Sequence, residues 1–120
     1  MAPKQKYVLD LGLSDDFTLL GIACHARDYR FCWMLNQQLG IKLRKIRDFF
    51  PETTQPGSEN GFACYFAEYP FLDEQFYLLN NRSDGRDLVD KHRQVDYFLF
   101  VHDLAYPGGP RALVEEVKKI

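Results

Sequence analysis

The sequence predicts an α+β fold in which one mostly antiparallel sheet of about five to six strands carries two helices on one face. Most apolar segments follow the two-residue period of strands, whereas only residues 26–39 and 110–120 show helical spacing. Aromatic residues make up 15% of the 120 residues, which favours a sheet-rich fold. Six strands interrupted by a single helix and followed by another are typical of α+β proteins.

The first two strands are expected at residues 7–13 and 17–24. Leu9, Leu11 and Leu13 alternate with smaller or polar residues, which is typical of a half-exposed strand. The second segment is apolar on both sides and predicts a strand that is buried on both faces. The short polar residues 14–16 predict the turn between them.

Residues 26–39 are expected to form the first helix, which closes at Gly40 in left-handed geometry. Its core-facing stripe is expected to comprise Tyr29, Cys32, Trp33 and Asn36, with Leu35 and Leu39 beside them. Residues 41–49 return to a two-residue period but lose phase between Leu43 and Ile46. This segment therefore predicts a strand with a bulge.

The second half of the chain predicts a hairpin of residues 61–71 and 74–82, then a strand over residues 95–101 and a final helix. Val95, Tyr97, Leu99 and Val101 share one face of that strand, and Asp96, Phe98, Phe100 and His102 share the other. A strand with apolar residues on both faces must be covered on both, so we expect it at the centre of the sheet.

The composition describes one globular domain over residues 1–120, with 46% hydrophobic and 27% charged residues. A net charge of -2 gives no general attraction to nucleic acid or anionic membranes. No segment approaches the ~18–20 apolar residues that span a bilayer, and no signal-peptide region is visible. The three cysteines are unclustered, as expected of reduced thiols. We therefore expect a cytoplasmic protein without a cofactor.

Residues 89–99 (VDKHRQVDYFL) resemble the signature of the IPExxxVDY family, which comprises small uncharacterised bacterial proteins found mainly in the Bacteroidetes group. Val95, Asp96 and Tyr97 match that signature, and Val89 is a conservative match. Residues 6–19 and 28–36 support the resemblance, which spans about residues 6 to 103. The family has no established activity, so the resemblance implies a fold and no mechanism.

The chain departs from that signature at two positions. Asp90 stands where the family has proline, and Lys91 stands where it has glutamate. Family members are somewhat longer, with another strand after the second helix. The resemblance therefore implies a shortened C-terminus here.

Asp96 is expected to order the start of its strand by accepting a hydrogen bond from a backbone N–H or from an arginine such as Arg93.

Cys24, His25 and Asp28 form the cluster with the most chemical character, and they offer a first alternative function, that of a small enzyme with a Cys/His site near residues 24–28. A thiolate near a helix N-terminus has a lowered pKa, and an adjacent imidazole could accept its proton. Neighbouring residues on a strand point to opposite faces, however, so we expect structural roles for Cys24 and His25. The cysteines and histidines show neither C-x-x-C nor H-x-x-x-H spacing, so no metal site is expected.

A basic segment offers a second alternative. It comprises Lys42, Arg44, Lys45 and Arg47, which could follow a nucleic-acid backbone beside exposed aromatic rings. Positive charge on an edge strand also discourages unwanted strand pairing. Since the net charge is negative, the sequence favours this second interpretation.

The aromatic residues of the hairpin outnumber what one helix-covered face can hold. Some must lie on the opposite face, where they would form an apolar patch too large for a monomer. The candidate interface residues are Phe62, Tyr65, Phe66, Tyr69, Phe76, Tyr77, Phe98 and Phe100. The sequence thus favours a non-catalytic binding module that contacts another protein, most simply a second copy in a homodimer.

Overall fold

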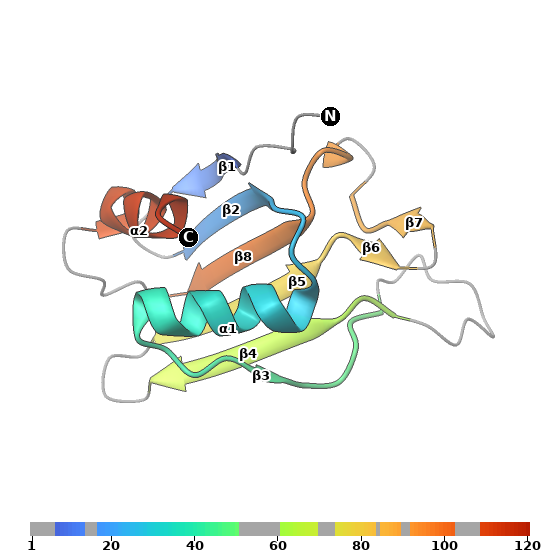
Figure 1. Cartoon of the computed structure of the whole chain (residues 1–120), viewed down its shortest axis with the longest axis horizontal. Helices are drawn as coiled ribbons and strands as arrows, with labels where there is room; N and C mark the ends of the chain where they lie inside the picture. The colour runs from blue at the N-terminus through green and yellow to red at the C-terminus, as the bar shows by residue number, and fades with distance from the viewer. Residues whose placement is uncertain are drawn as a thin grey trace.

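The main sheet has six strands in the order β1-β2-β8-β5-β4-β3, and each neighbouring pair is antiparallel (Figure 1). The computed structural model describes residues 7–13, 17–50, 61–69, 74–83, 85–89, 92–102 and 109–120. The elements are β1 (Tyr7–Leu13), β2 (Phe17–Ala23), α1 (Asp28–Leu39), β3 (Arg44–Lys45), β4 (Cys64–Tyr69), β5 (Glu74–Asn80), β6 (Arg82–Ser83), β7 (Arg86–Asp87), β8 (Tyr97–His102) and α2 (Gly109–Lys118).

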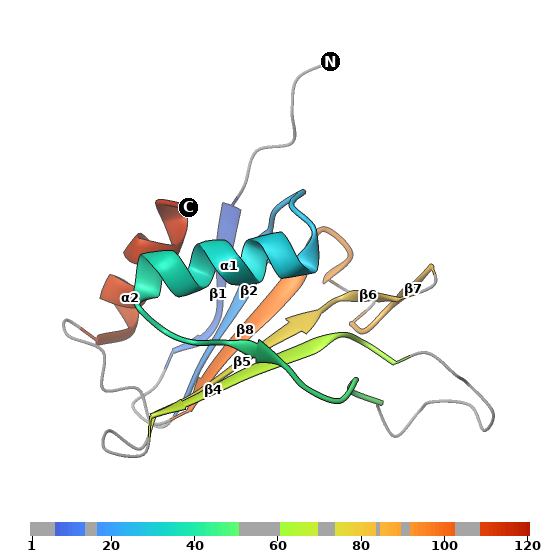
Figure 2. The same ribbon diagram turned by 60° about the horizontal axis from the view of Figure 1, so that its bottom comes forward.

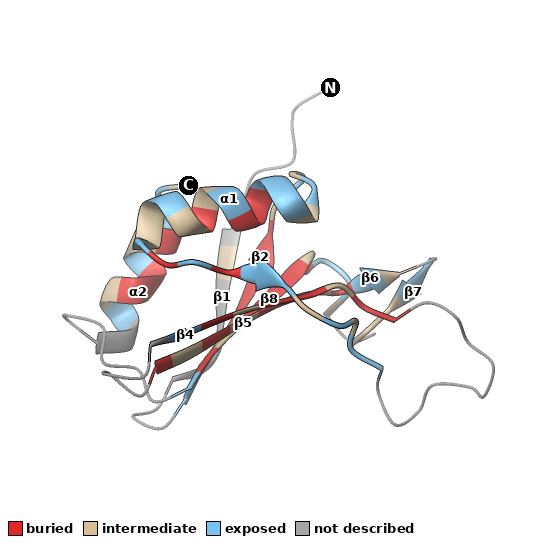
Figure 3. Cartoon of the chain, turned by 90° about the horizontal axis from the view of Figure 1, so that it is seen from below, coloured by how far each residue is buried: buried red, intermediate tan, exposed pale blue. Residues whose placement is uncertain are grey.

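Both helices lie on the same face of this sheet, and the small β6–β7 hairpin extends from one end (Figures 2 and 3). Leu113 and Val117 of α2 are fully buried, and Ile120 packs against the core. Gln38 of α1 donates a 2.7 Å hydrogen bond to Glu116 of α2. In the described part of the chain, neither helix is long and apolar enough to cross a membrane. The predicted α+β fold class is confirmed.

Strand β8 lies between β2 and β5, as its apolar character on both faces predicted. Leu99 pairs with Leu20 on one side and with Leu78 on the other, and all three side chains are fully buried. They belong to the core between the sheet and the helices. The alternating residues Phe98 and Phe100 therefore point to the opposite face.

Helix α1 is rotated relative to the predicted stripe. Its buried residues are Phe31, Cys32 and Leu35, whereas Tyr29 and Trp33 are 66% and 62% exposed. The prediction was wrong for Tyr29 and Trp33 because the helix carries two adjacent apolar rows. The ring of Phe31 stacks on Tyr97 of β8 at 4.7 Å between centroids, and this contact fixes which row faces the sheet.

The connection after α1 is held by the helix itself. Gly40 has a φ of 66° and ends the helix in the predicted left-handed conformation. The Asn36 side chain then accepts a 2.8 Å hydrogen bond from the Leu43 amide and donates a 3.2 Å bond to the Leu43 carbonyl. Asn36 therefore orders the turn into β3 rather than contributing to an apolar stripe.

The strand expected over residues 41–49 is much shorter than predicted. Only Arg44 and Lys45 pair with β4, and an isolated bridge joins Phe49 to Phe62. The register of the first hairpin shifts between Asp10 and Gly12. A one-residue shift also follows Lys45, close to the predicted bulge, because the step from Lys45 to Phe49 covers four residues whereas the opposite step from Tyr65 to Phe62 covers three. Ile46 in this segment lines the face opposite the helices.

The chain leaves the main sheet after β5 and returns to it at β8, and Asn81 holds together the described residues of this excursion, which are 81–83, 85–89 and 92–96. Asn81 is fully buried. Its amide nitrogen donates to the carbonyls of His92 (3.0 Å) and Val95 (2.8 Å), and its oxygen accepts from the Val89 amide (2.9 Å). A single side chain thus satisfies three backbone groups and fixes Val89 and His92 against the end of the sheet.

Candidate functional site

An aromatic ladder crosses the sheet face opposite the helices. It consists of one ring each from β2, β8, β5 and β4, namely Phe17, Phe100, Tyr77 and Phe66. Successive ring centroids are 5.6, 6.3 and 4.8 Å apart, within the range of favourable aromatic pairs. The ladder follows from strand register, since Phe100 pairs with Tyr77 and Tyr77 with Phe66 across the sheet.

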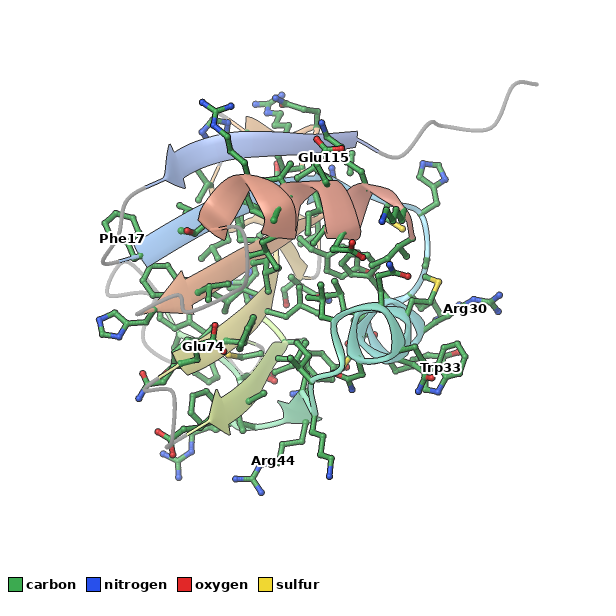
Figure 4. The ribbon with its side chains drawn as sticks, turned by 90° about the vertical axis from the view of Figure 1, so that its left-hand side faces the viewer. Phe17, Arg30, Trp33, Arg44, Glu74 and Glu115 are labelled. Atoms are coloured by element: carbon green, nitrogen blue, oxygen red, sulfur yellow. The ribbon has the colours of Figure 1, made fainter. Side chains whose placement is uncertain are left out.

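In the described part of the chain, no helix covers this ladder. Figure 4 shows Phe17 on the side of the sheet away from α1, whereas Trp33 points outward from the helix on the other side. Phe17 is 40% exposed, and the other three rings are partly exposed. Partly exposed rings in a row across four strands form an apolar surface of the kind that binds partners.

Beside the ladder, the same face is hollowed into a groove of about 860 Å³. Its floor is formed by side chains from four strands, which are Leu19, Cys64, Tyr77, Leu79, Phe98 and Phe100. One wall is formed by residues 46–49 and another by Leu88, Val89 and His92. Phe17 and Phe66, at the two ends of the ladder, do not line it.

Both walls of the groove are fixed to the sheet. The Ile46 amide donates to the Cys64 carbonyl at 3.0 Å, and Phe49 and Phe62 exchange backbone hydrogen bonds at 2.8 and 2.9 Å. Gly61 permits this approach, because a Cβ there would lie 2.8 Å from the Phe49 carbonyl oxygen. The second wall is held by Asn81. The groove is therefore built into the fold and closed on two sides.

Three polar side chains line the groove among otherwise apolar ones. They are Arg47, Asp48 and His92. Asp48 accepts a 2.7 Å hydrogen bond from the ammonium group of Lys45, which balances its charge. The rings of His92 and Phe98 form a T-shaped pair with centroids 6.5 Å apart. Burial raises the pKa of the Cys64 thiol on the floor, so this side chain is neutral at physiological pH and behaves as an apolar group.

The predicted interface residues divide between the two faces. Phe66, Tyr77, Phe98 and Phe100 lie on the open face, as expected, although Phe98 is covered by the excursion and only 5% exposed. Tyr65 and Phe76 belong to the core on the helix side, because strand register places them beside Lys45 and Val101. For these two residues the expectation was wrong.

The remaining two interface candidates lie elsewhere. Phe62 is buried at 3% exposure, and the guanidinium of Arg86 lies over its ring. It is therefore not part of an open surface, contrary to the expectation. Tyr69 ends β4, and its side chain lies outside the described residues.

Cys24 and His25 lie in the connection between β2 and α1, and Asp28 is the first residue of α1. The Cys24 amide donates to Asp96 at 2.7 Å, and Asp28 accepts from the Tyr65 hydroxyl at 2.9 Å. His25 is exposed. A small hollow of about 280 Å³ lies beside Cys24, His25 and Asp96. The contacts of this cluster serve to position α1.

Two buried tyrosines, Tyr65 and Tyr97, also hold the region where β2 connects to α1. The Tyr97 hydroxyl donates to the Ala26 carbonyl. Burial, together with its hydrogen bond to Asp28, raises the pKa of Tyr65. Burial and the nearby charge of Asp28 raise the pKa of Tyr97. Both hydroxyls therefore stay protonated and remain hydrogen-bond donors over the whole physiological range.

Asp96 performs the ordering role expected from the sequence, with a different arginine. Its second carboxylate oxygen accepts from Arg82, which also donates to the Arg93 carbonyl. The residues that carry the family resemblance, Val95, Asp96 and Tyr97, thus connect the start of the central strand to the β2–α1 connection and to the β6–β7 hairpin. Val89 donates its amide to Asn81 in the same region.

Replacing Asp96 by alanine is expected to lower the free energy of unfolding by about 2 kcal/mol, since the Cys24 amide loses a charged acceptor. The exposed Arg82 contributes little to this value, because exposed ion pairs are weak. Urea denaturation measures the loss. Asp96→Asn is the control, since it keeps an oxygen that can accept from Cys24. Equal stability of Asp96→Ala and the wild type would contradict the ordering role.

The predicted basic segment does not form a continuous patch. Lys45 is paired with Asp48, and Arg47 lines the groove. Arg44 lies at the sheet edge opposite Phe66 and is exposed, as Figure 4 shows, and together with Lys42 it lines a separate hollow beside Trp33. The cations are thus divided between that hollow, which Lys42 and Arg44 line, and the groove, which Arg47 lines.

No family model, curated protein or solved structure matches the chain. The resemblance to the IPExxxVDY family therefore stays a prediction. Among the described residues, no group of three or more His, Cys, Asp or Glu side chains could hold a metal ion. The candidate site rests on the geometry of the open face alone.

Two features of this site were not predicted from the sequence. Asn81 lies outside the hairpin strand expected over residues 74–82, and the asparagine pair at residues 80–81 after a strand is a turn signal. The place of Phe17 on the open face follows directly from its position two residues before Leu19. That alternation was visible in the sequence.

Proposed function

We propose that this protein is a non-catalytic cytoplasmic binding module that forms a homodimer through the aromatic ladder on its open sheet face. The observation that carries the proposal is the ladder itself, which joins four strands and ends at Phe17, a side chain 40% exposed. Removing partly exposed rings from water stabilises a complex by ~25 cal/mol per Å² of apolar surface.

A second copy is the simplest partner for such a face. In a two-fold dimer each surface meets itself, so aromatic ladder would pack against aromatic ladder without unmatched charges. Four strands spaced ~4.8 Å apart and six residues long give a face on the order of 400 Å². A standard interface buries ~800 Å² per partner, so residues around the ladder would supply the rim.

Binding is favoured over catalysis because the contacts of Asp28 and of the Cys24 backbone serve to hold the β2–α1 connection. Binding to protein is favoured over binding to nucleic acid because Lys45 is paired with Asp48 and the net charge is negative. The resemblance to the IPExxxVDY family is compatible with this proposal and adds no activity to it.

Phe17→Glu is expected to convert the dimer into a monomer, because it places a charge at the end of the ladder where the partner would pack. Sedimentation velocity at micromolar concentrations measures the change. Phe17 is suited to this substitution because its exposed side chain contributes little to the core.

Tyr29→Glu is the matched control, since Tyr29 is also an exposed aromatic residue but lies on α1. This variant is expected to sediment like the wild type. A wild-type protein that is monomeric throughout the micromolar range would overturn the proposal. So would a dimer that Phe17→Glu leaves intact.

A further inference from the structure

The groove beside the ladder has the size and closure of a ligand site. Its volume of about 860 Å³ lies within the ~300–1,000 Å³ typical of small-molecule sites. Its floor spans four strands, and its two walls are held by backbone hydrogen bonds and by Asn81. Since these contacts exist in the single chain, the groove is preformed rather than created by a partner.

The lining selects a ligand that is apolar along most of its length. Apart from Arg47, Asp48 and His92, the groove is lined by aliphatic and aromatic side chains and one thiol. Leu79, Phe98 and Cys64 form the part of the floor closest to both walls. A polar ligand would lose its hydration there without gaining hydrogen bonds in return. An unbranched hydrocarbon chain makes no hydrogen bonds to water and so would lose none on entering the groove.

The polar side chains place positive charge at one wall. Asp48 is paired with Lys45 at 2.7 Å, so these two charges compensate each other. Arg47, directly before Asp48 in the same wall, forms no ion pair with any other described residue. Its planar guanidinium can bind a carboxylate through two parallel hydrogen bonds. The charge of the groove therefore complements an anion.

We propose that the groove binds a single-chain aliphatic carboxylate, with its hydrocarbon chain along Leu79 and Phe98 and its carboxylate at Arg47. This inference rests on the binding role proposed above but uses a different part of the open face. The ladder ends at Phe17 and Phe66, and neither lines the groove. Tyr77 and Phe100 border both surfaces.

Isothermal titration of the full chain with soluble alkanoates tests the apolar half of this proposal. Each added methylene that enters the groove is expected to tighten binding roughly fourfold. A series from octanoate to dodecanoate, kept below micelle formation, measures this gradient. Affinity that does not change with chain length would overturn the proposal.

The head group is tested with dodecanoate, dodecanol and dodecyltrimethylammonium. Dodecanoate is expected to bind about tenfold more tightly than dodecanol, and the cation more weakly still. Arg47→Gln is expected to remove the advantage of dodecanoate and leave dodecanol unchanged. Arg44→Gln is the matched control, because Arg44 is a neighbouring exposed cation that does not line the groove. Equal effects of the two variants would overturn the assignment of Arg47.

Leu79→Trp is expected to fill the groove and weaken the binding of every alkyl ligand, and urea denaturation verifies that the variant folds.

Vesicles of phosphatidylglycerol test whether the protein binds a membrane surface instead of a free ligand. Sedimentation with these vesicles, without any binding of monomeric dodecanoate, would overturn the proposal in favour of a lipid surface.

Phe17→Glu distinguishes this inference from dimerisation. Because Phe17 lies outside the groove, the variant is expected to bind dodecanoate like the wild type even as a monomer. A wild-type monomer that binds dodecanoate would overturn only the homodimer. A dimer that does not bind dodecanoate would overturn only the ligand.

Discussion

Replacing Asn81 by alanine is expected to lower the free energy of unfolding by about 3 to 5 kcal/mol, because three backbone groups lose their hydrogen-bond partner in a buried position. Asn81 is fully buried, so water cannot replace the lost side chain without opening the excursion over residues 81–96. Urea denaturation monitored by circular dichroism measures the loss.

The adjacent Asn80 provides the matched control. Its side-chain oxygen is buried but has no hydrogen-bond partner among the described residues. Asn80→Ala therefore removes an unsatisfied polar atom and is expected to change stability by less than about 1 kcal/mol. Similar losses in both variants would show that the hydrogen bonds of Asn81 are not what holds the excursion.

The second large effect is expected at Phe31, where substitution by alanine should cost about 3 to 5 kcal/mol. Phe31 is fully buried, and its ring stacks on Tyr97 at 4.7 Å. Its removal leaves a cavity between α1 and the central strand that the surrounding side chains cannot fill. The measurement is again the free energy of unfolding.

Trp33→Ala is the control on the same helix. Trp33 is larger than Phe31 but 62% exposed, so its loss is expected to change stability by about 0.5 kcal/mol or less. A larger loss at Trp33 than at Phe31 would mean that α1 packs through the row predicted from its spacing, rather than through the row that the structure places against the sheet.

The central strand and the fold class were predictable because the residue pattern that places β8 in the sheet lies within the strand itself. A strand with Leu99 on one face and Phe98 and Phe100 on the other can only lie inside a sheet. Gly40 was predictable for the same reason, since left-handed geometry favours glycine at that one position.

The orientation of α1 was not predictable, because its two apolar rows are equivalent until something selects one. That selection is made by Tyr97, which is distant in sequence and stacks on Phe31. The short β3 has a similar cause. Residues 46–49 read as a strand, but beyond Lys45 they shift by one residue relative to β4, with Ile46 bonded to Cys64 and Phe49 to Phe62. Tertiary contacts decided both outcomes.

The existence of an open aromatic face followed from counting rings, but its composition depended on register. A shift by one residue moves a side chain to the other face, and this separates Tyr65 and Phe76 from Phe66 and Tyr77. The groove was not predictable, since both of its walls are held in place by tertiary contacts. Only Asn81 and Gly61 mark the contacts that hold them.

The position of β8 between β2 and β5 has a consequence for how the chain reaches this structure. The β1–β2 and β4–β5 hairpins are each local in sequence and can form early, but they remain separate until Tyr97–His102 inserts between them. During synthesis that strand emerges after both hairpins. Until then, β2 and β5 expose unpaired apolar edges, so the nascent protein is most prone to association just before its sheet is complete.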